Sequence, residues 1–406
     1  MMMYQMYQAQ ADATEQLRLW ASAMSALLHN PFAEAFAPYG MGFVTAGYDM
    51  LARTGFSHER KPFGIDAVRI GDEDVPVIEE AFDRTPFATL LHFRKESELA
   101  LPRVLLVAPM SGHFATLLRA TVRTMLPDHD VYLTDWHNAR DIKLEDGRFG
   151  VDEYVEHVVR FLEKIGPGGH VVAICQPCVA VLEAVAVMAE AGNPAQPRSM
   201  TLMAGPVDAR VSPTRVNELS TGHPIEWFER NFITTVPLRF RGANRRVYPG
   251  FLQLLAFVSM NLERHVEAHW ELYNDIAAGK DERAKAISSF YDEYFAVADL
   301  SAEFYLETVK SIFQDYDLAR GVAQYHGRRV NPGAIERTAL LTVEGERDDV
   351  CGIGQTMAAH ELCTGIRPYR KRHHLQPGVG HYGVFSGHRW AQQVYPMVRN
   401  LILSSD

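Results

Sequence analysis

The chain has 406 residues, 47% hydrophobic and 22% charged, which is typical of a globular protein with a large buried core. A net charge of −10 argues against nucleic acid as a main partner, and four cysteines are too few for a disulfide framework, which favours a reducing, cytoplasmic compartment. The longest apolar run, residues 171–189, contains Gln176, Pro177 and Glu183, so no membrane span is predicted, and no basic secretory signal region precedes Arg18.

The first 55 or so residues are predicted to be helical. Apolar side chains recur there at helical spacing, at Leu17, Trp20, Met24, Leu27 and Leu28. Packing of this face on the rest of the same chain is the favoured interpretation. Contact with a hydrophobic surface or a partner subunit is the alternative, so a homo-oligomer stays open. We assign residues 1–60 to an N-terminal helical extension.

Residues 61–209 alternate between strand and helix patterns. Extended segments at 75–78 and 87–93 predict antiparallel strands. Buried strands are predicted at 103–108, 131–135, 170–175 and 199–204. Helices are predicted at 114–125 and at 152–165, with Asp152 as the N-cap of the second. Such alternation is typical of an α/β fold with a mostly parallel sheet covered on both faces.

The alternation stops between residues 210 and 335, where the pattern is mostly helical and rich in aromatic residues. We interpret this stretch as a helical cap whose aromatic side chains either line an apolar groove or pack in the cap itself. The sheet resumes in residues 336–406, with strands near 338–343 and 370–375 and a final helix at 390–401. The cap also holds a cluster of four arginines, Arg239, Arg241, Arg245 and Arg246. We expect them to form a solvated face; the alternative is that they bind the phosphates of coenzyme A.

A predicted strand that turns directly into a helix carries Cys175. The apolar run before it stops at the cysteine, and Pro177 suits the first turn of a helix. A nucleophile at such a turn is the nucleophile elbow of an α/β-hydrolase, here with cysteine in place of the usual serine. Cys175 is therefore the predicted nucleophile, with the Gln176 N–H facing the oxyanion. Cys178 is the weaker candidate and fits a small buried side chain.

The other parts of an acyl-transfer site follow in the order nucleophile, acid, histidine, which is the α/β-hydrolase order. A carboxylate loop after the strand at 338–343 holds Asp348, the predicted acid, with Asp349 as runner-up. Glycines on both sides of His381 allow a tight turn after the last strand, and a neutral histidine can take the thiol proton. His381 is therefore the predicted base.

The oxyanion needs a second N–H donor, which we assign to Met110, or next to Ser111, in the loop after residues 103–108. Ser111 itself lacks an elbow and is a poor nucleophile candidate. Cys175 and Cys178 also form a C-x-x-C pair, which redox proteins use, but the pair lies deep in a large sheet. No second C-x-x-C accompanies it, so a zinc site is a still weaker alternative than a redox pair. No bound cofactor is predicted.

Several blocks of the sequence resemble two related families. Ala173-Ile-Cys-Gln-Pro177 and Val131-Tyr-Leu-Thr-Asp-Trp-His-Asn138 are similar to the elbow and a strand–loop segment of polyhydroxyalkanoate synthases, with the elbow's two glycines replaced by Ala173 and Pro177. The closer resemblance is to intracellular polyhydroxybutyrate depolymerases, at Cys-Gln-Pro and in residues 205–216, 343–350 and 380–385.

The resemblance implies an α/β-hydrolase with a helical cap that attacks amorphous polyhydroxybutyrate on cytoplasmic granules. It implies that Cys175 is the nucleophile and that Asp348 and His381 are the acid and base. It leaves open whether water or coenzyme A accepts the acyl group. Two rival functions are a synthase-like acyltransferase that uses the same thioester and a non-catalytic protein that coats granules.

Overall fold

The computed structural model describes residues 2–29, 41–97, 99–260 and 262–406. Residues 1 and 30–40 of the predicted N-terminal extension, residue 98 of the predicted core and residue 261 of the predicted cap lie outside the described residues. No helix in the described part of the chain is long and apolar enough to cross a membrane.

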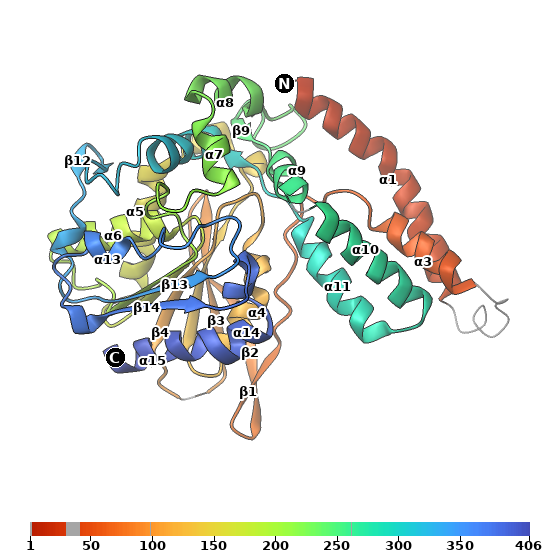
Figure 1. Ribbon diagram of the computed structural model, residues 1–406. Coiled ribbons are helices and arrows are strands. Elements are labelled where there is room, and N and C mark those ends of the chain that lie inside the picture. The colour runs from red at the N-terminus through yellow and green to blue at the C-terminus, as the bar shows by residue number, and fades with distance from the viewer. Residues whose placement is uncertain (1, 30–40, 98, 261) are drawn as a thin grey trace.

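A nine-stranded sheet forms the centre of the molecule, in the order β1-β2-β3-β5-β4-β6-β7-β13-β14 (Figure 1). β1, β2 and β3 are antiparallel, and from β5 onward the strands run parallel. The central strands β6 and β7 are buried along their whole length, as a sheet covered on both faces requires. The strands are β1 (Ala67–Ile70), β2 (Glu73–Arg84), β3 (Ala88–Lys95), β4 (Arg103–Val107), β5 (Asp130–Trp136), β6 (His170–Ile174), β7 (Ser199–Met203), β13 (Ala339–Gly345) and β14 (Lys371–Gln376).

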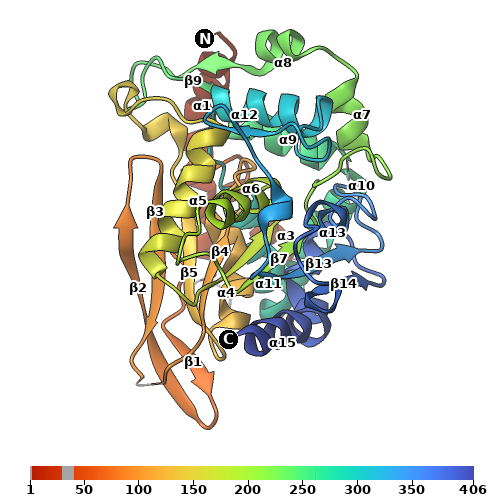
Figure 2. The same ribbon diagram turned by 90° about the vertical axis from the view of Figure 1, so that its left-hand side faces the viewer.

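Helices surround this sheet (Figure 2). α5 packs beside α6, and α15 packs on β7 and β13. The arrangement confirms the predicted α/β-hydrolase fold class. The helices of this core are α4 (Arg119–Met125), α5 (Val151–Ile165), α6 (Cys178–Glu190), α13 (Ala359–Leu362), α14 (Gly387–Arg389) and α15 (Tyr395–Ser405).

The predicted N-cap of α5 is wrong. The helix begins at Val151, and its N-cap is Gly150, whose N–H donates to the Glu153 carboxylate at 2.6 Å. Asp152 lies inside the first turn, where a carboxylate still interacts favourably with the helix dipole. A glycine without a side chain can take the cap position because Glu153 supplies the acceptor.

The segment between β7 and β13 is mostly helical, but it also holds short strands that the sequence did not predict. β8 (Thr234–Thr235), β9 (Arg246–Tyr248) and β10 (Leu300–Ser301) form a small sheet, and β11 (Gln324–Tyr325) pairs with β12 (Arg328–Arg329). Strands of two or three residues are too short to leave a period in the sequence. The helices of this segment are α7 (Arg215–Thr221), α8 (Ile225–Phe232), α9 (Gly250–Met260), α10 (Leu262–Ala277), α11 (Asp281–Tyr294) and α12 (Ala302–Thr308).

An arm of helices projects from the core (Figure 1). α1 (Met2–Leu28) contacts α3 (Met41–Ala52), α3 contacts α10, and α10 contacts α11. The expectation that the apolar face of the first helix packs on the chain is right only in part. α1 packs on α3, and Met24 and Leu28 are half-buried, but Leu17, Trp20 and Leu27 are 48%, 50% and 59% exposed. The helix is also anchored at its start, where the buried Tyr4 hydroxyl donates to Asp299 at 2.6 Å.

Glu183, a buried carboxyl group in the middle of α6, should make stability depend on pH. Burial, with smaller contributions from Asp152 and Asp317, raises the pKa of Glu183 to about 8 from 4.5. Between those values the folded protein keeps a proton that the unfolded chain has lost, so stability should fall as pH rises from about 5 to about 8 and then level off. Glu183→Gln should remove this part of the fall.

Urea unfolding at pH 5.5, 7 and 8.5 checks this expectation. The control is Glu190→Gln on the exposed end of the same helix, which should keep the wild-type pH dependence. An unchanged pH dependence in Glu183→Gln would contradict it.

Candidate active site

Cys175 occupies a sharp turn between β6 and α6. Its backbone φ is 67°, a left-handed conformation that costs a non-glycine residue about 1–3 kcal/mol. The turn is held by the Cys175 N–H, which donates to the Met203 carbonyl at 2.7 Å, and by the Cys175 carbonyl, which accepts from the Cys178 N–H at 3.2 Å. Pro177, with φ −65°, is the N-cap of α6. The side chain of Cys175 is partly exposed, as a nucleophile requires.

At the elbow, residues 175–178 come very close to Gly205, just beyond β7. A Cβ on this residue would lie 2.2 Å from the Cys178 Cβ and 2.7 Å from the Cys175 carbonyl oxygen. Ala173 lies fully buried in β6, so its methyl group is accommodated there. The close packing at the elbow therefore depends on Gly205, at the end of the neighbouring strand. This leaves room for Ala173 and Pro177 at the elbow positions where glycine is usual.

Cys178 has a different environment from Cys175. It is the first residue of α6. Its side chain is fully buried, with Sγ 3.5 Å from the Ala173 carbonyl and 3.6 Å from the Met203 carbonyl. Burial raises the pKa of Cys178, so its thiol stays protonated and inert.

Asp348 and His381 form a buried pair at the ends of β13 and β14. His381 Nδ1 lies 2.8 Å from Asp348 Oδ2, and the two side chains are 7% and 1% exposed. The other carboxylate oxygen of Asp348 accepts the N–H groups of Val350 and Cys351, each at 2.9 Å. These bonds fix the carboxylate, so it fixes the orientation of the imidazole in turn.

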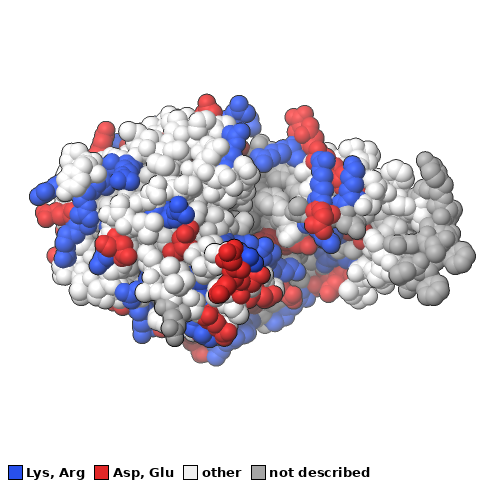
Figure 3. All heavy atoms as spheres, turned by 90° about the horizontal axis from the view of Figure 1, so that it is seen from below, with Lys and Arg blue, Asp and Glu red and all other residues white. Residues whose placement is uncertain are grey.

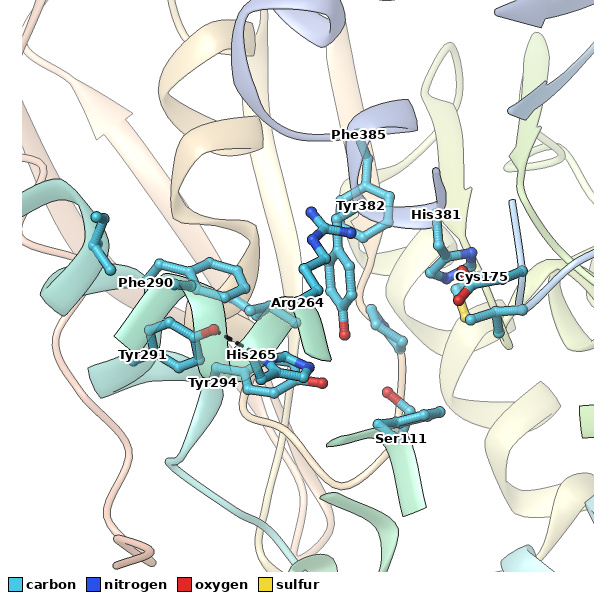
Figure 4. Close-up of a pocket in the computed structure, with 17 residues that line it drawn as sticks. Ser111, Cys175, Arg264, His265, Phe290, Tyr291, Tyr294, His381, Tyr382 and Phe385 are labelled. Carbon is cyan, nitrogen blue, oxygen red and sulfur yellow. Dashed lines mark hydrogen bonds between the residues drawn. The ribbon is translucent and has the colours of Figure 1, made fainter. Parts of the chain in front are cut away.

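The imidazole of His381, which bonds to Asp348 through Nδ1, lies beside Cys175 (Figure 4). Burial alone would lower the pKa of His381, but the charges of Asp348 and Cys175 outweigh it and hold the pKa well above its usual value. A base in this setting can take a proton from the Cys175 thiol and hold it as an imidazolium. The structure thus brings together the three residues that the sequence singled out.

Backbone hydrogen bonds join the elbow to the acid loop across the sheet. Beyond the Cys175–Met203 bond, the Ala204 N–H donates to the Val343 carbonyl at 2.8 Å. The Gly205 N–H donates to Thr356 Oγ1 at 2.9 Å, and the Thr356 N–H donates to the buried Glu344 carboxylate at 2.8 Å. The distance between nucleophile and acid is therefore set by paired strand ends. Sequence reasoning missed the positioning roles of Glu344 and Thr356.

The loop after β4 carries the predicted second oxyanion donor. The Ala108 N–H donates to Thr134 Oγ1 at 2.9 Å, and its carbonyl accepts from Trp136 Nε1 at 2.9 Å, which pins the start of the loop. Among the described residues, neither the Met110 N–H nor the Gln176 N–H has a hydrogen-bond acceptor. Both residues line one cavity together with Cys175. Two free donors beside the sulfur are what an oxyanion site needs.

Two mainly apolar cavities meet at Cys175, with volumes of about 410 and 430 Å³. Both are in the range of small-molecule sites. We call the smaller the His381 cavity and the larger the Gln176 cavity, after a residue that lines only that one. The residues common to both are Ser111, Cys175, Phe257 and Val350.

The cap supplies about half of the wall of the His381 cavity (Figure 4). Arg264 and His265 come from α10, and Tyr291 and Tyr294 come from α11. His265 Nδ1 is 2.9 Å from the Tyr291 hydroxyl. The sequence showed that this segment is aromatic but not which of its residues reach the site. Only Tyr382 carried a usable signal, because it directly follows His381.

The wall of the Gln176 cavity also draws on the cap. It is lined by apolar and aromatic side chains from several helices, among them Phe228, Phe232, Tyr248, Leu252, Phe304, Tyr305 and Phe313. Tyr248 and Tyr305 stack with ring centroids 3.8 Å apart. Part of the cap aromatics therefore lines cavities and part packs elsewhere, and Trp270 is 65% exposed.

The cysteines show neither a disulfide nor a metal cluster. All four are free thiols. Within residues 2–29, 41–97, 99–260 and 262–406, no group of three or more His, Cys, Asp or Glu side chains could hold a metal ion. Cys351 and Cys363 are buried.

The expectation that the four cap arginines form a solvated face is wrong for Arg245. Arg245 is buried and donates to the carbonyls of Ile142 and Gly147, at 3.0 and 2.8 Å. Arg239 pairs with Asp12, and Arg246 pairs with Glu229. Lys and Arg are likewise interspersed with Asp and Glu on the face shown in Figure 3.

The fold has solved relatives of low sequence identity. The 2-hydroxy-6-oxo-6-phenylhexa-2,4-dienoate hydrolase of Rhodococcus sp. strain RHA1 is 13% identical, with a TM-score of 0.42, over 81% of this chain and 99% of that one. The monoacylglycerol lipase of Paleococcus ferrophilus is 11% identical, with a TM-score of 0.43, over 76% of this chain and 97% of that one.

No curated protein matches the chain. The family model described as the C-terminus of PHB de-polymerases matches residues 204–406, which is half of the chain. The matched region contains Asp348 and His381, and Cys175 precedes it. The chain is therefore an ester hydrolase of the α/β-hydrolase fold and belongs to the PHB depolymerase family.

Proposed function

We propose that the protein is a polyhydroxybutyrate depolymerase that cleaves ester bonds of amorphous poly(3-hydroxybutyrate) through Cys175, His381 and Asp348. The observation that carries the proposal is the buried Asp348–His381 hydrogen bond of 2.8 Å beside a cysteine held at a strained elbow. This is the geometry of a nucleophile, base and orienting acid. The family to which the chain belongs supplies the polymer as the substrate class.

The reaction begins when His381 takes the proton of the Cys175 thiol. The thiolate attacks an ester carbonyl, and the charge on its oxygen is stabilised by the N–H groups of Gln176 and Met110. The carbon–oxygen bond of the ester then breaks, and the leaving alkoxide takes the proton from His381. The product is a 3-hydroxyacyl thioester on Cys175. Water or the thiol of coenzyme A attacks this thioester and releases the acyl group.

The cavity linings support a neutral aliphatic substrate. Each exposes mainly apolar surface, which excludes water from the thioester and suits a polyester without charged side groups. Side chains and backbone N–H groups carry the proposed chemistry. Coenzyme A enters only as an acyl acceptor.

Association with polymer granules is part of the proposal. Trp20 on α1 and Val266 and Trp270 on α10 are 50%, 60% and 65% exposed. α10 also supplies Arg264 and His265 to the His381 cavity, so Val266 and Trp270 lie on the same helix as part of its wall. Exposed apolar side chains beside the cavity suit an enzyme that works at the surface of an insoluble polymer.

Product analysis tests the function. Purified protein incubated with amorphous granules should release soluble 3-hydroxybutyrate or its oligomers, and mass spectrometry with and without coenzyme A identifies the acceptor. Incubation with 3-hydroxybutyryl-CoA alone should not lengthen the polymer. Polymer growth would favour a synthase-like acyltransferase, and no release at all would favour a non-catalytic granule protein.

A further inference from the structure

The two cavities at Cys175 can be assigned to the two halves of the ester, provided that the proposed function holds. An ester under attack has an acyl half, which stays on the sulfur, and an alcohol half, which leaves. The group that gives its proton to the leaving oxygen must lie on the alcohol side. His381 lines only one of the two cavities, whereas Met110 and Gln176 line only the other. The alcohol half therefore belongs in the His381 cavity.

A polymer of hydroxyacyl units has two different termini, a hydroxyl group at one end and a carboxyl group at the other. Every alcohol half released from it ends in a carboxyl group, whereas every acyl half ends in a neutral hydroxyl group. A cation that recognises a chain end is therefore useful only on the alcohol side, because guanidinium groups bind carboxylates through paired, charge-assisted hydrogen bonds.

Arg264 is a cation in the wall of the His381 cavity. Its guanidinium group projects from α10 toward Tyr382 (Figure 4). Among the described residues it has neither an ion pair nor a hydrogen bond, whereas many other surface arginines are paired with carboxylates. The acidic residue in the same lining, Asp349, has an interaction of its own. The charge of Arg264 is thus available to a ligand.

We propose that the His381 cavity holds the leaving alcohol half and that Arg264 binds the terminal carboxylate of this half. The ligand is the free carboxylate of a short hydroxyacyl oligomer, so Arg264 makes such oligomers preferred substrates over neutral esters of the same length. Arg215, in the wall of the Gln176 cavity, faces the half that ends in a hydroxyl group and has no such role.

The experiment compares 3-hydroxybutyrate dimer, trimer and tetramer as free acids and as methyl esters. Wild-type protein should cleave at least one of the acids with a kcat/KM about tenfold above that of its methyl ester, since hydrogen bonds to charged groups contribute this much. Arg264→Gln should bring the ratio close to one, and Arg264→Lys should restore part of it. The matched control Arg215→Gln should keep the wild-type ratio. p-Nitrophenyl butyrate, which has no carboxylate, reports on folding and basic turnover in every variant.

Three results would overturn the proposal. Wild-type protein could show no preference for the acids at any length, or Arg215→Gln could abolish the preference while Arg264→Gln keeps it. Arg264→Gln could also raise only the KM for coenzyme A, which would make a phosphate of coenzyme A the anion. Failure of the proposed function looks different, because Cys175→Ala would then still cleave the oligomers.

Discussion

Cys175→Ala is expected to lower the release of soluble 3-hydroxybutyrate from amorphous polymer by about 10⁴-fold or more, because removal of a covalent nucleophile eliminates the acyl-enzyme route. The fold should be unaffected, since the side chain is partly exposed at the turn. Alanine keeps the backbone N–H groups that would hold the oxyanion, so the loss isolates the contribution of the sulfur. Rates on granules and on p-nitrophenyl butyrate measure it.

The matched control is Cys178→Ala, at the other cysteine of the C-x-x-C pair. Its thiol is buried and has no path to a substrate, so the variant should keep activity within a few-fold of wild type while losing some stability. If Cys175→Ala retained activity and Cys178→Ala lost it, the nucleophile would be misassigned. If both lost activity to the same degree, the pair would act together, as in redox chemistry.

Asp348→Asn is expected to lower kcat by about 10²- to 10⁴-fold, the range typical of an orienting carboxylate in a triad. The amide oxygen can still accept from Val350 and Cys351, so the loop should keep its shape. The negative charge that stabilises the imidazolium is lost, however. The pKa of His381 should therefore fall, because Asp348 is what holds it above its usual value against burial.

Two measurements check this second expectation. Initial rates give the loss in kcat, and NMR titration of the His381 ring protons gives the direction of its pKa change. Asp349→Asn is the control, because Asp349 is exposed and the imidazole Nδ1 of His381 bonds to Asp348; the kcat of this variant should change less than tenfold. A larger loss for Asp349→Asn than for Asp348→Asn would make Asp349 the acid.

The sequence predicted those parts of the site that depend on local pattern. A strand, a cysteine and a proline-started helix within ten residues define the elbow, and the chain order of Asp348 and His381 identified their pairing. Arg264 and the aromatic wall could not be placed, because their position depends on how α10 and α11, which lie far from His381 in the sequence, pack over the sheet. The partial exposure of the apolar face of α1 was missed for the same reason: periodicity identifies an apolar face but not how much of it is covered.

Backbone hydrogen bonds link Cys175 to Met203 and Ala204 to Val343. They determine where the attacking atom lies but not which element it is. The place of attack is fixed by main-chain groups at three strand ends, none of which depends on the side chain at position 175. The attacking atom is fixed by that one side chain alone. A lineage with this sheet could therefore exchange sulfur for oxygen in a single substitution without moving the acid or the base. Divergence between thiol and hydroxyl nucleophiles then requires no rebuilding of the scaffold.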